Sequence, residues 1–204
     1  MLEEPQTGPK AAAPAVDDET DLALLTGIRS GNRAALKTLY VKYYPRLLRF
    51  IYRITGQLEL AQEGINDTML VVWRDSGAFQ GRSTVATWIM GIAYRKALSL
   101  HRDARRRSER QLDVEDFDEW IERSGAAERP RDSTEIRDLL TRAIFQLSPD
   151  QRAVVELTYF YGCSYKEIAE IVSCPVNTVK TRMFHARRKL KTLLPRLGRD
   201  DVLP

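Results

Sequence analysis

The chain has 204 residues, which is enough for one larger domain or two small ones. Its hydrophobic fraction of 43% and charged fraction of 29% are typical of a soluble helical protein, and no apolar run approaches the roughly 20 residues that span a bilayer. The first residues lack the basic stretch and apolar core of a secretory signal, so we expect a cytoplasmic protein.

The net charge of +4 is modest, but the charges are unevenly distributed. Residues 178–199 hold eight Lys or Arg and no acid, residues 102–110 hold five Arg, and residues 108–138 hold eleven acids against five Arg. Such alternation indicates two polyanion-binding surfaces separated by a segment that avoids or mimics nucleic acid. Charge alone does not separate this hypothesis from an ordinary solvated surface.

Residues 1–20 begin with a stretch rich in Pro and Ala that holds almost no large apolar side chain, and we predict a disordered tail. Helical patterning follows. Apolar side chains spaced three and four apart from Leu36 to Ile54 predict a long amphipathic helix, with Asn32 as its cap and Gly56 at its end.

Two further helices and a linker are predicted next. Apolar periodicity indicates a helix over residues 58–74 and another over residues 84–106, separated by a loop with two glycines. The acidic stretch 108–132 has weak periodicity and contains Gly and Pro, so we predict a linker with one short helix near residues 117–121. No strand-type alternation is present. The predicted fold class is all-α, with two small helical domains, 21–107 and 133–197, joined by the linker.

The C-terminal domain carries the strongest local signals. Ser148-Pro149-Asp150-Gln151 and Ser164-Tyr165-Lys166-Glu167 are both capping boxes that start helices. The second box opens a short helix that a turn, SCPV, separates from a basic helix beginning near Asn177. Two helices joined by a tight turn, the second one basic, are typical of a helix-turn-helix. Four apolar side chains are predicted to face inward and set the angle between the helices: Ile168, Val172, Val179 and Met183.

The start and outer face of the basic helix are polar and cationic, which suits contacts with base edges and phosphates in a major groove. A basic helical hairpin with no DNA-binding role has the same amphipathic pattern. Two capping boxes, a proline at the turn and an acid-free second helix together favour DNA binding. The candidate DNA-binding residues are Asn177, Thr178, Lys180, Thr181, Arg182, His185, Arg187 and Arg188.

Several segments resemble a known family. The run LSPDQRAVVELTYFYGCSYKEIAEIVSCPVNTVKTRMFHARRKL resembles region 4 of the extracytoplasmic-function sigma factors of bacterial RNA polymerase. AALKTLYVKYYPRLLRFIYR, AQEGINDTMLVVW and TWIMGIAYRKALSLHR resemble the three helices of region 2 in the same family. The resemblance covers roughly residues 21–195 and implies the minimal architecture of region 2, linker and region 4.

The resemblance implies an alternative sigma factor that binds the beta and beta-prime subunits of core RNA polymerase. Such a factor recognises the −10 and −35 elements of promoter DNA and initiates transcription of a stress or envelope-response regulon. Family members are usually held by an anti-sigma factor, and anchoring of that inhibitor would keep the complex at the inner membrane. The helix-turn-helix residues above would then contact the −35 element.

Two further sets of residues receive roles from the resemblance. Glu63, Asn66 and Asp67 form one polar face of the second helix and would dock on the beta-prime clamp helices. The loop before the third helix and an outward stripe on that helix would receive the −10 element, where strand opening is offset by base capture and by cationic contacts. The −10 candidates are Arg82, Ser83, Thr84, Tyr94, Arg95, Leu98 and Arg102. Trp88 is either a core residue or a stacking platform for DNA.

Two other classes of protein share parts of this pattern. A helix-turn-helix repressor or response-regulator output domain explains the C-terminal half alone, because the N-terminal half lacks the strand–helix alternation of a receiver domain. An enzyme acting on nucleic acid has little to support it, since the chain has two histidines and neither a metal-ligand cluster nor a Gly-rich phosphate loop. Cys163 and Cys174 lack zinc-site spacing. We therefore expect no catalysis, cofactor, metal or small-molecule substrate.

Overall fold

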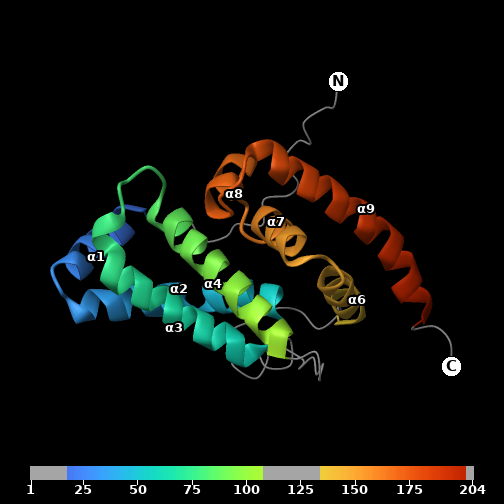
Figure 1. Cartoon of the computed structure of the whole chain (residues 1–204), viewed down its shortest axis with the longest axis horizontal. Coiled ribbons are helices and arrows are strands. Elements are labelled where there is room, and N and C mark those ends of the chain that lie inside the picture. Colours follow the sequence, from blue (N-terminus) through green and yellow to red (C-terminus); the bar gives the residue numbers. More distant parts are fainter. Residues whose placement is uncertain (1–17, 108–133, 201–204) are drawn as a thin grey trace.

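The computed structural model describes residues 18–107 and 134–200. Every regular element in these two stretches is helical and no strand occurs in them, which confirms the predicted all-α fold (Figure 1). The first stretch forms α1 (Asp18–Arg29), α2 (Arg33–Thr55), α3 (Leu58–Asp75), the short 3-10 turn η1 (Ser76–Ala78) and α4 (Val85–Arg107). The second forms α6 (Thr134–Phe145), α7 (Pro149–Tyr159), α8 (Tyr165–Ile171) and α9 (Val176–Asp200).

Two predictions concern segments that lie outside the described residues: residues 1–17 of the tail, and the linker with its short helix at 117–121. None of the described helices is long and apolar enough to cross a membrane. Helix α1 begins at Asp18, three residues before the predicted start of the folded part. This difference has a tertiary cause, because the Asp18 carboxylate accepts a hydrogen bond from the Val85 amide of α4 at 2.9 Å.

Helix α2 is the central helix of the first half, and its ends are where the sequence predicted them. The Asn32 side chain accepts hydrogen bonds from the Ala34 and Ala35 amides, and Gly56 ends the helix with a positive φ of 77°. Its inward face is fully buried at Leu39, Leu47, Phe50, Ile51 and Ile54. The predicted apolar periodicity is therefore the core-facing side of the helix.

Helices α3 and α4 pack against α2, and α1 crosses one end of the group. Gly64 marks the closest approach, since a Cβ there would lie 3.0 Å from the Ile51 side chain and 3.2 Å from that of Leu100. Asp21 secures α1, because this fully buried carboxylate accepts hydrogen bonds from Lys42 at 2.5 Å and from Tyr43 at 2.6 Å. A buried charge with two such partners avoids the cost of an unpaired one.

In the second half, α7 and α8 begin with the two predicted capping boxes. Ser148 accepts from the Gln151 amide and Ser164 from the Glu167 amide, and in each box the reciprocal bond is also present. The four side chains predicted to face inward are all buried, with at most 6% of their surface exposed: Ile168, Val172, Val179 and Met183. The helix-turn-helix geometry therefore follows from local sequence signals.

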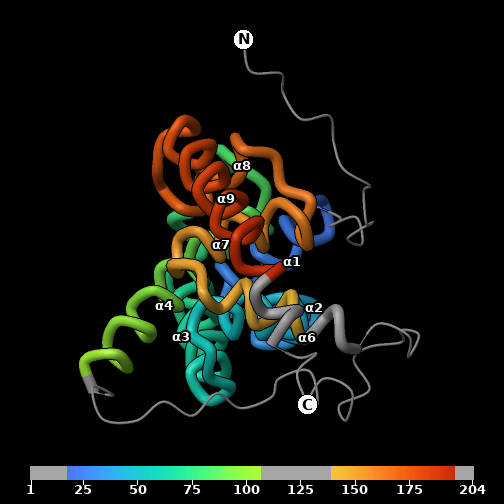
Figure 2. Tube along the Cα trace, turned by 90° about the vertical axis from the view of Figure 1, so that its right-hand side faces the viewer, coloured from blue at the N-terminus to red at the C-terminus, as the bar shows by residue number. Residues whose placement is uncertain are grey.

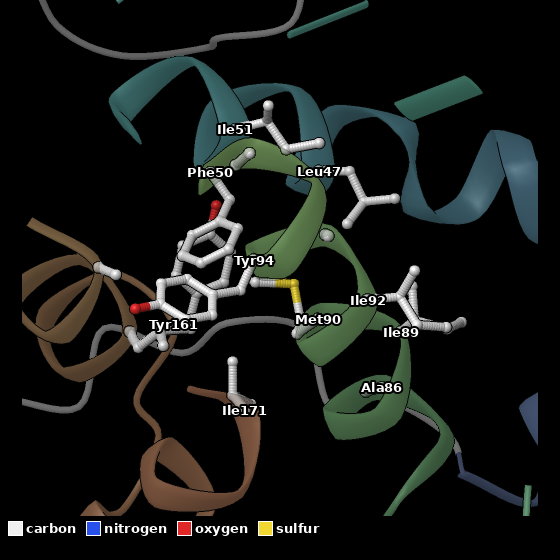
Figure 3. Packing of buried hydrophobic residues seen from close by; sticks show 14 of the residues in the cluster. Leu47, Phe50, Ile51, Ala86, Ile89, Met90, Ile92, Tyr94, Tyr161 and Ile171 are labelled. Atoms are coloured by element: carbon white, nitrogen blue, oxygen red, sulfur yellow. The ribbon is translucent and has the colours of Figure 1, made fainter. Parts of the chain in front are cut away.

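The two halves share one hydrophobic core. Helix α7 lies against α2, and α8 lies against α4 (Figure 1; Figure 2). Tyr161, two residues after the last residue of α7, packs edge-on against Phe50 of α2, and its hydroxyl donates to the Arg46 carbonyl at 2.8 Å. Figure 3 shows Tyr161 beside Tyr94 of α4, with Ile171 of α8 below them. The described parts of the two domains are thus packed together.

The Asn32 cap gives a test of the start of α2. Asn32→Ala should lower the free energy of unfolding by about 1 kcal/mol, because the Ala34 and Ala35 amides lose their acceptor. Asn32→Asp puts a carboxylate oxygen in the place of the amide oxygen that accepts these bonds, and it should retain most of the stability. Urea unfolding followed by circular dichroism measures both, and an unchanged midpoint for Asn32→Ala would contradict the capping role.

Candidate nucleic-acid and polymerase interface

The N-terminal part of α9 presents a polar and cationic face to solvent. Of the candidate −35 residues, Asn177, Lys180, Thr181, His185, Arg187 and Arg188 are exposed, whereas Thr178 and Arg182 are half-buried. No acid lies between residues 176 and 199. The structure therefore brings most of these side chains together on one helix, with the charge that phosphates require.

Two arginines of that set already have partners within the chain. Arg182 binds the Asp150 carboxylate with an Nη2–Oδ2 distance of 2.8 Å, which ties α9 to the first turn of α7. Arg187 donates from Nε and Nη2 to the Tyr159 hydroxyl, at 3.1 and 2.7 Å. These bonds orient the two guanidinium groups, and Arg182 in particular has a structural role that the sequence did not indicate.

Two apolar side chains on the exposed side of α9 were missed by sequence reasoning. Phe184 is 62% exposed and Val176 is 37% exposed, although both lie on the helix that carries the basic face. Phe184 follows Lys180 by four residues and packs edge-on against His185 with ring centroids 5.5 Å apart. Phe184 comes directly after the buried Met183 and five residues after the buried Val179, and this spacing was the signal that would have placed it outside. Val176 lies three residues before Val179, on the same side of the helix, so spacing gave no such signal for it.

The loop residues before α4 are used partly for helix capping. Thr84 Oγ1 accepts a hydrogen bond from the Thr87 amide at 3.1 Å, so Thr84 caps the start of α4. Arg82 is exposed and Ser83 is half-buried. In Figure 1 the loop between α3 and α4 projects beyond the packed helices. It thus offers a cation and two hydroxyls at the edge of the first half.

The predicted outward stripe on α4 is wrong at one position. Arg95 and Arg102 are exposed and Leu98 is half-buried, but Tyr94 is only 4% exposed. Its hydroxyl donates to Asp150 Oδ1 at 2.6 Å, and its ring lies among the buried residues of both halves (Figure 3). Burial, together with this carboxylate, raises the pKa of Tyr94 far above its ordinary value, so the hydroxyl remains a donor.

The acidic face of α3 is assembled as predicted by helical spacing. Glu63 and Asn66 are exposed, and Asn66 accepts a hydrogen bond from the Tyr40 hydroxyl at 3.1 Å. Asp67 pairs with Lys96 of α4 at 3.0 Å. Leu70, which is 52% exposed, follows Asp67 on this side of the helix and was missed because the face was treated as purely polar. The face therefore combines carboxylates with an exposed apolar side chain.

Among the described residues, no group of three or more His, Cys, Asp or Glu side chains is placed to hold a metal ion. Burial raises the pKa of Cys163 to about 11, so this thiol is protonated at neutral pH. Neither observation adds chemistry to the DNA-binding face or to the acidic face.

A helix-turn-helix whose second helix holds no acid before its last residue, packed on a separate helical bundle that carries an acidic face, defines a two-domain DNA-binding transcription factor. Comparison with known families agrees. Residues 39–107 match the Sigma-70 region 2 model, and residues 137–190 match the Sigma-70 region 4 model.

Relatives extend the match over most of the chain. It is 32% identical over 189 residues to the RNA polymerase sigma-H factor of Pseudomonas aeruginosa, covering 89% of this chain and 97% of the relative. It is 29% identical over 178 residues to the ECF RNA polymerase sigma-E factor of Escherichia coli K12, covering 84% and 92%. The chain belongs to the sigma-70 family and is an alternative sigma factor of the extracytoplasmic-function group.

Solved structures show the same architecture. The sigma factor RpoE of Bartonella quintana, in complex with the anti-sigma factor NepR, matches 78% of this chain and 96% of its own, with a TM-score of 0.61 and 25% identity. CnrH, in complex with the cytosolic domain of CnrY, matches 87% and 98% with a TM-score of 0.62. At 21% identity the second match bears on the fold alone.

The buried position of Tyr94 can be tested with a matched pair of variants. Tyr94→Phe should lower the free energy of unfolding by about 1–2 kcal/mol, because it removes a buried hydrogen bond to a carboxylate. Tyr40→Phe removes a hydroxyl bonded to Asn66 at the surface and should change stability little. Chemical denaturation of the full chain measures both. Equal effects in the two variants would show that Tyr94 is not buried in solution.

Proposed function

We propose that the chain is a promoter-specificity subunit that binds the beta and beta-prime subunits of core RNA polymerase and directs them to −10 and −35 elements. The observation that carries this proposal is the exposed, acid-free face of α9 in a capped helix-turn-helix. In this proposal residues 21–107 act as region 2, residues 108–132 as the linker and residues 133–197 as region 4.

In region 4, the start of α9 enters the major groove at the −35 element. Asn177, Lys180 and Thr181 are exposed in its first turns, where side chains reach base edges. His185, Arg187 and Arg188 lie further along the helix and suit phosphate contacts. Thr178 and Arg182 are half-buried. In this proposal they help to fix the position of α9 on the rest of region 4, and their polar groups also contact DNA.

In region 2, the loop before α4 and the exposed part of α4 receive the −10 element. Arg82, Ser83 and Thr84 offer hydrogen bonds at the start of the helix, and Arg95, Leu98 and Arg102 continue along it. Captured bases and a cationic track together offset the few kcal/mol that unstacking a base costs. Tyr94 is buried against the second half of the chain, and it joins this surface only when that half moves away from α4.

We further propose control by an anti-sigma factor. The support is the Bartonella quintana relative, which is described in complex with such a protein and is similar over 78% of this chain. A cytoplasmic location follows from the proposed role, and a membrane-anchored anti-sigma factor would hold the chain at the inner membrane. No catalytic step by the chain itself is part of this proposal.

Transcription by a reconstituted enzyme tests the function. Core RNA polymerase supplied with the full chain should start transcription at a defined promoter on genomic DNA fragments from the source organism, and core alone should not. Mapped start sites identify the −10 and −35 sequences. If core ignored the chain while the chain alone protected an operator from cleavage, a repressor would be the better description.

The acidic face of α3 gives a second test. Glu63→Lys should weaken binding to core RNA polymerase by about tenfold, because it reverses a charge opposite a basic partner surface. Glu63 is the cleaner choice because Asp67→Lys would also place a second cation beside Lys96. Glu19→Lys, an equal change on the exposed side of α1, is the matched control. Affinity chromatography on immobilised core measures both, and equal retention would contradict this docking face.

A further inference from the structure

The last residue of α7, Tyr159, lies beside the basic face of α9. Helices α7 and α9 pack together (Figure 1), yet the Tyr159 side chain is 50% exposed. Arg187 of α9 donates from Nε and Nη2 to the Tyr159 hydroxyl, at 3.1 and 2.7 Å. An exposed aromatic residue that lies outside the helix-turn-helix is thus bonded to a candidate DNA-binding side chain.

Arg187 lies on the side of α9 that is proposed to face DNA. It follows Lys180 by seven residues, about two turns of an α-helix, so the two side chains project from the same face. Both are exposed. When the start of α9 lies in a major groove, the sugar–phosphate backbone runs along the edge of this face. The Tyr159 hydroxyl is therefore placed at the backbone rather than at the bases.

The partner of Arg187 leaves the charge of this arginine available. Arg182, nearer the start of α9, is paired with the Asp150 carboxylate, which offsets the charge of the guanidinium. The Tyr159 hydroxyl holds the Arg187 guanidinium by hydrogen bonds and, unlike a carboxylate, brings no negative charge that would repel a phosphate. Arg187 is thus oriented while it keeps its attraction for an anion.

The Tyr159–Arg187 pair keeps hydrogen-bond donors for a ligand. The two bonds use two of the five N–H groups of the guanidinium, at its Nε–Nη2 edge, and leave the Nη1–Nη2 edge. The Tyr159 oxygen accepts both bonds with its lone pairs, so its own O–H remains a donor. Arg187 Cζ lies 5.8 Å from the ring centroid, close to the limit of about 6 Å for a cation–π contact, so hydrogen bonds rather than stacking hold the guanidinium.

We propose that Tyr159 and Arg187 form one phosphate-binding site, which extends the −35 interface from α9 onto the end of α7. The ligand is a single phosphodiester of the DNA backbone. Arg187 binds it with the guanidinium edge that Tyr159 leaves open, and Tyr159 donates its own O–H to the same phosphate. Tyr159 is both a DNA contact and the positioning residue for Arg187. This inference rests on the proposed function, in which α9 binds the −35 element.

Neutralising single phosphates tests the site on the intact holoenzyme. Core RNA polymerase with the full chain is bound to promoter DNA in which a methylphosphonate replaces one phosphate of the −35 region at a time. The wild type should lose affinity by about tenfold at the phosphate that the pair binds, because a charge-assisted contact is removed there. Tyr159→Phe should bind unmodified DNA about 3- to 10-fold more weakly than wild type, and should lose clearly less than wild type at that phosphate. Its profile at the other phosphates should match that of the wild type.

The dependence of binding on salt separates the two side chains. Arg187→Gln removes a cation from a phosphate, so the slope of log affinity against log salt concentration should become shallower by about one. Tyr159→Phe removes no charge and should keep the wild-type slope although it binds more weakly. The losses of affinity in the two variants should not add in the double variant, because without Arg187 the Tyr159 hydroxyl has no guanidinium to position.

A second tyrosine provides the matched control. Tyr44 is a half-buried residue of α2 in the other domain, and Tyr44→Phe removes a hydroxyl without changing charge. It should bind promoter DNA with the affinity, salt slope and phosphate profile of the wild type. Urea unfolding of Tyr159→Phe should give a midpoint close to that of the wild type, because the bonds that it removes lie at the surface.

The outcomes separate the phosphate site from the proposed function. If Tyr159→Phe weakened binding but lost as much as wild type at every neutralised phosphate, Tyr159 would only join two helices, and the site would be overturned. Equal affinity of Tyr159→Phe and wild type would overturn it as well. In both cases a wild-type holoenzyme that binds the promoter and initiates leaves the proposed function intact. If core with the wild-type chain bound no promoter, the proposed function would fail before any variant was compared, and the site would fall with it.

Discussion

The guanidinium of Arg152, in α7 of the second domain, joins the two domains by donating hydrogen bonds to carbonyls at the end of α2 in the first domain. The last carbonyls of α2 have no partner within the helix, and Arg152 donates to two of them, those of Arg53 and Ile54, at 3.2 Å each. Its Nε donates to the Leu147 carbonyl at 3.0 Å. Burial lowers the pKa of Arg152 to about 10, which still leaves it charged at neutral pH. Because this bond set places α7 on α2, it also determines where α8 meets α4.

The interface combines two buried charges that differ in how well they are satisfied. Arg152 has three carbonyl acceptors, so its position is well defined, whereas Glu156 one turn along α7 has no hydrogen bond. A satisfied polar group specifies one arrangement, and an unsatisfied one limits how stable that arrangement becomes. Specific but limited docking is what a chain needs if the same domains must separate to bind DNA.

Local signals in the sequence predicted the secondary structure well, but they did not predict contacts between residues far apart in the chain. The Asn32 cap, the two capping boxes and the inward face of the helix-turn-helix each depend on residues within one or two turns. Tyr94 was expected on the outside, because its partner Asp150 lies 56 positions away and nothing local indicates that α8 covers α4. Leu70 and Phe184 were missed for another reason: each is an apolar side chain on a face that was interpreted as polar. The sequence therefore located the sites on α3 and α9. It did not predict the exposed apolar side chains in those sites, nor the packing of α8 on α4.

The bond between Asp18 and Val85 bears on where region 2 can be cut. The region 2 model begins at residue 39, yet the start of α4 is held by a carboxylate 67 positions before it. A fragment trimmed to the family boundary loses α1 and with it the acceptor for the first amide of α4. The loop that carries Arg82 is attached to that first turn, so fraying there would alter the loop in an otherwise folded fragment. Residues outside the family boundary thus shape the surface proposed for the −10 element.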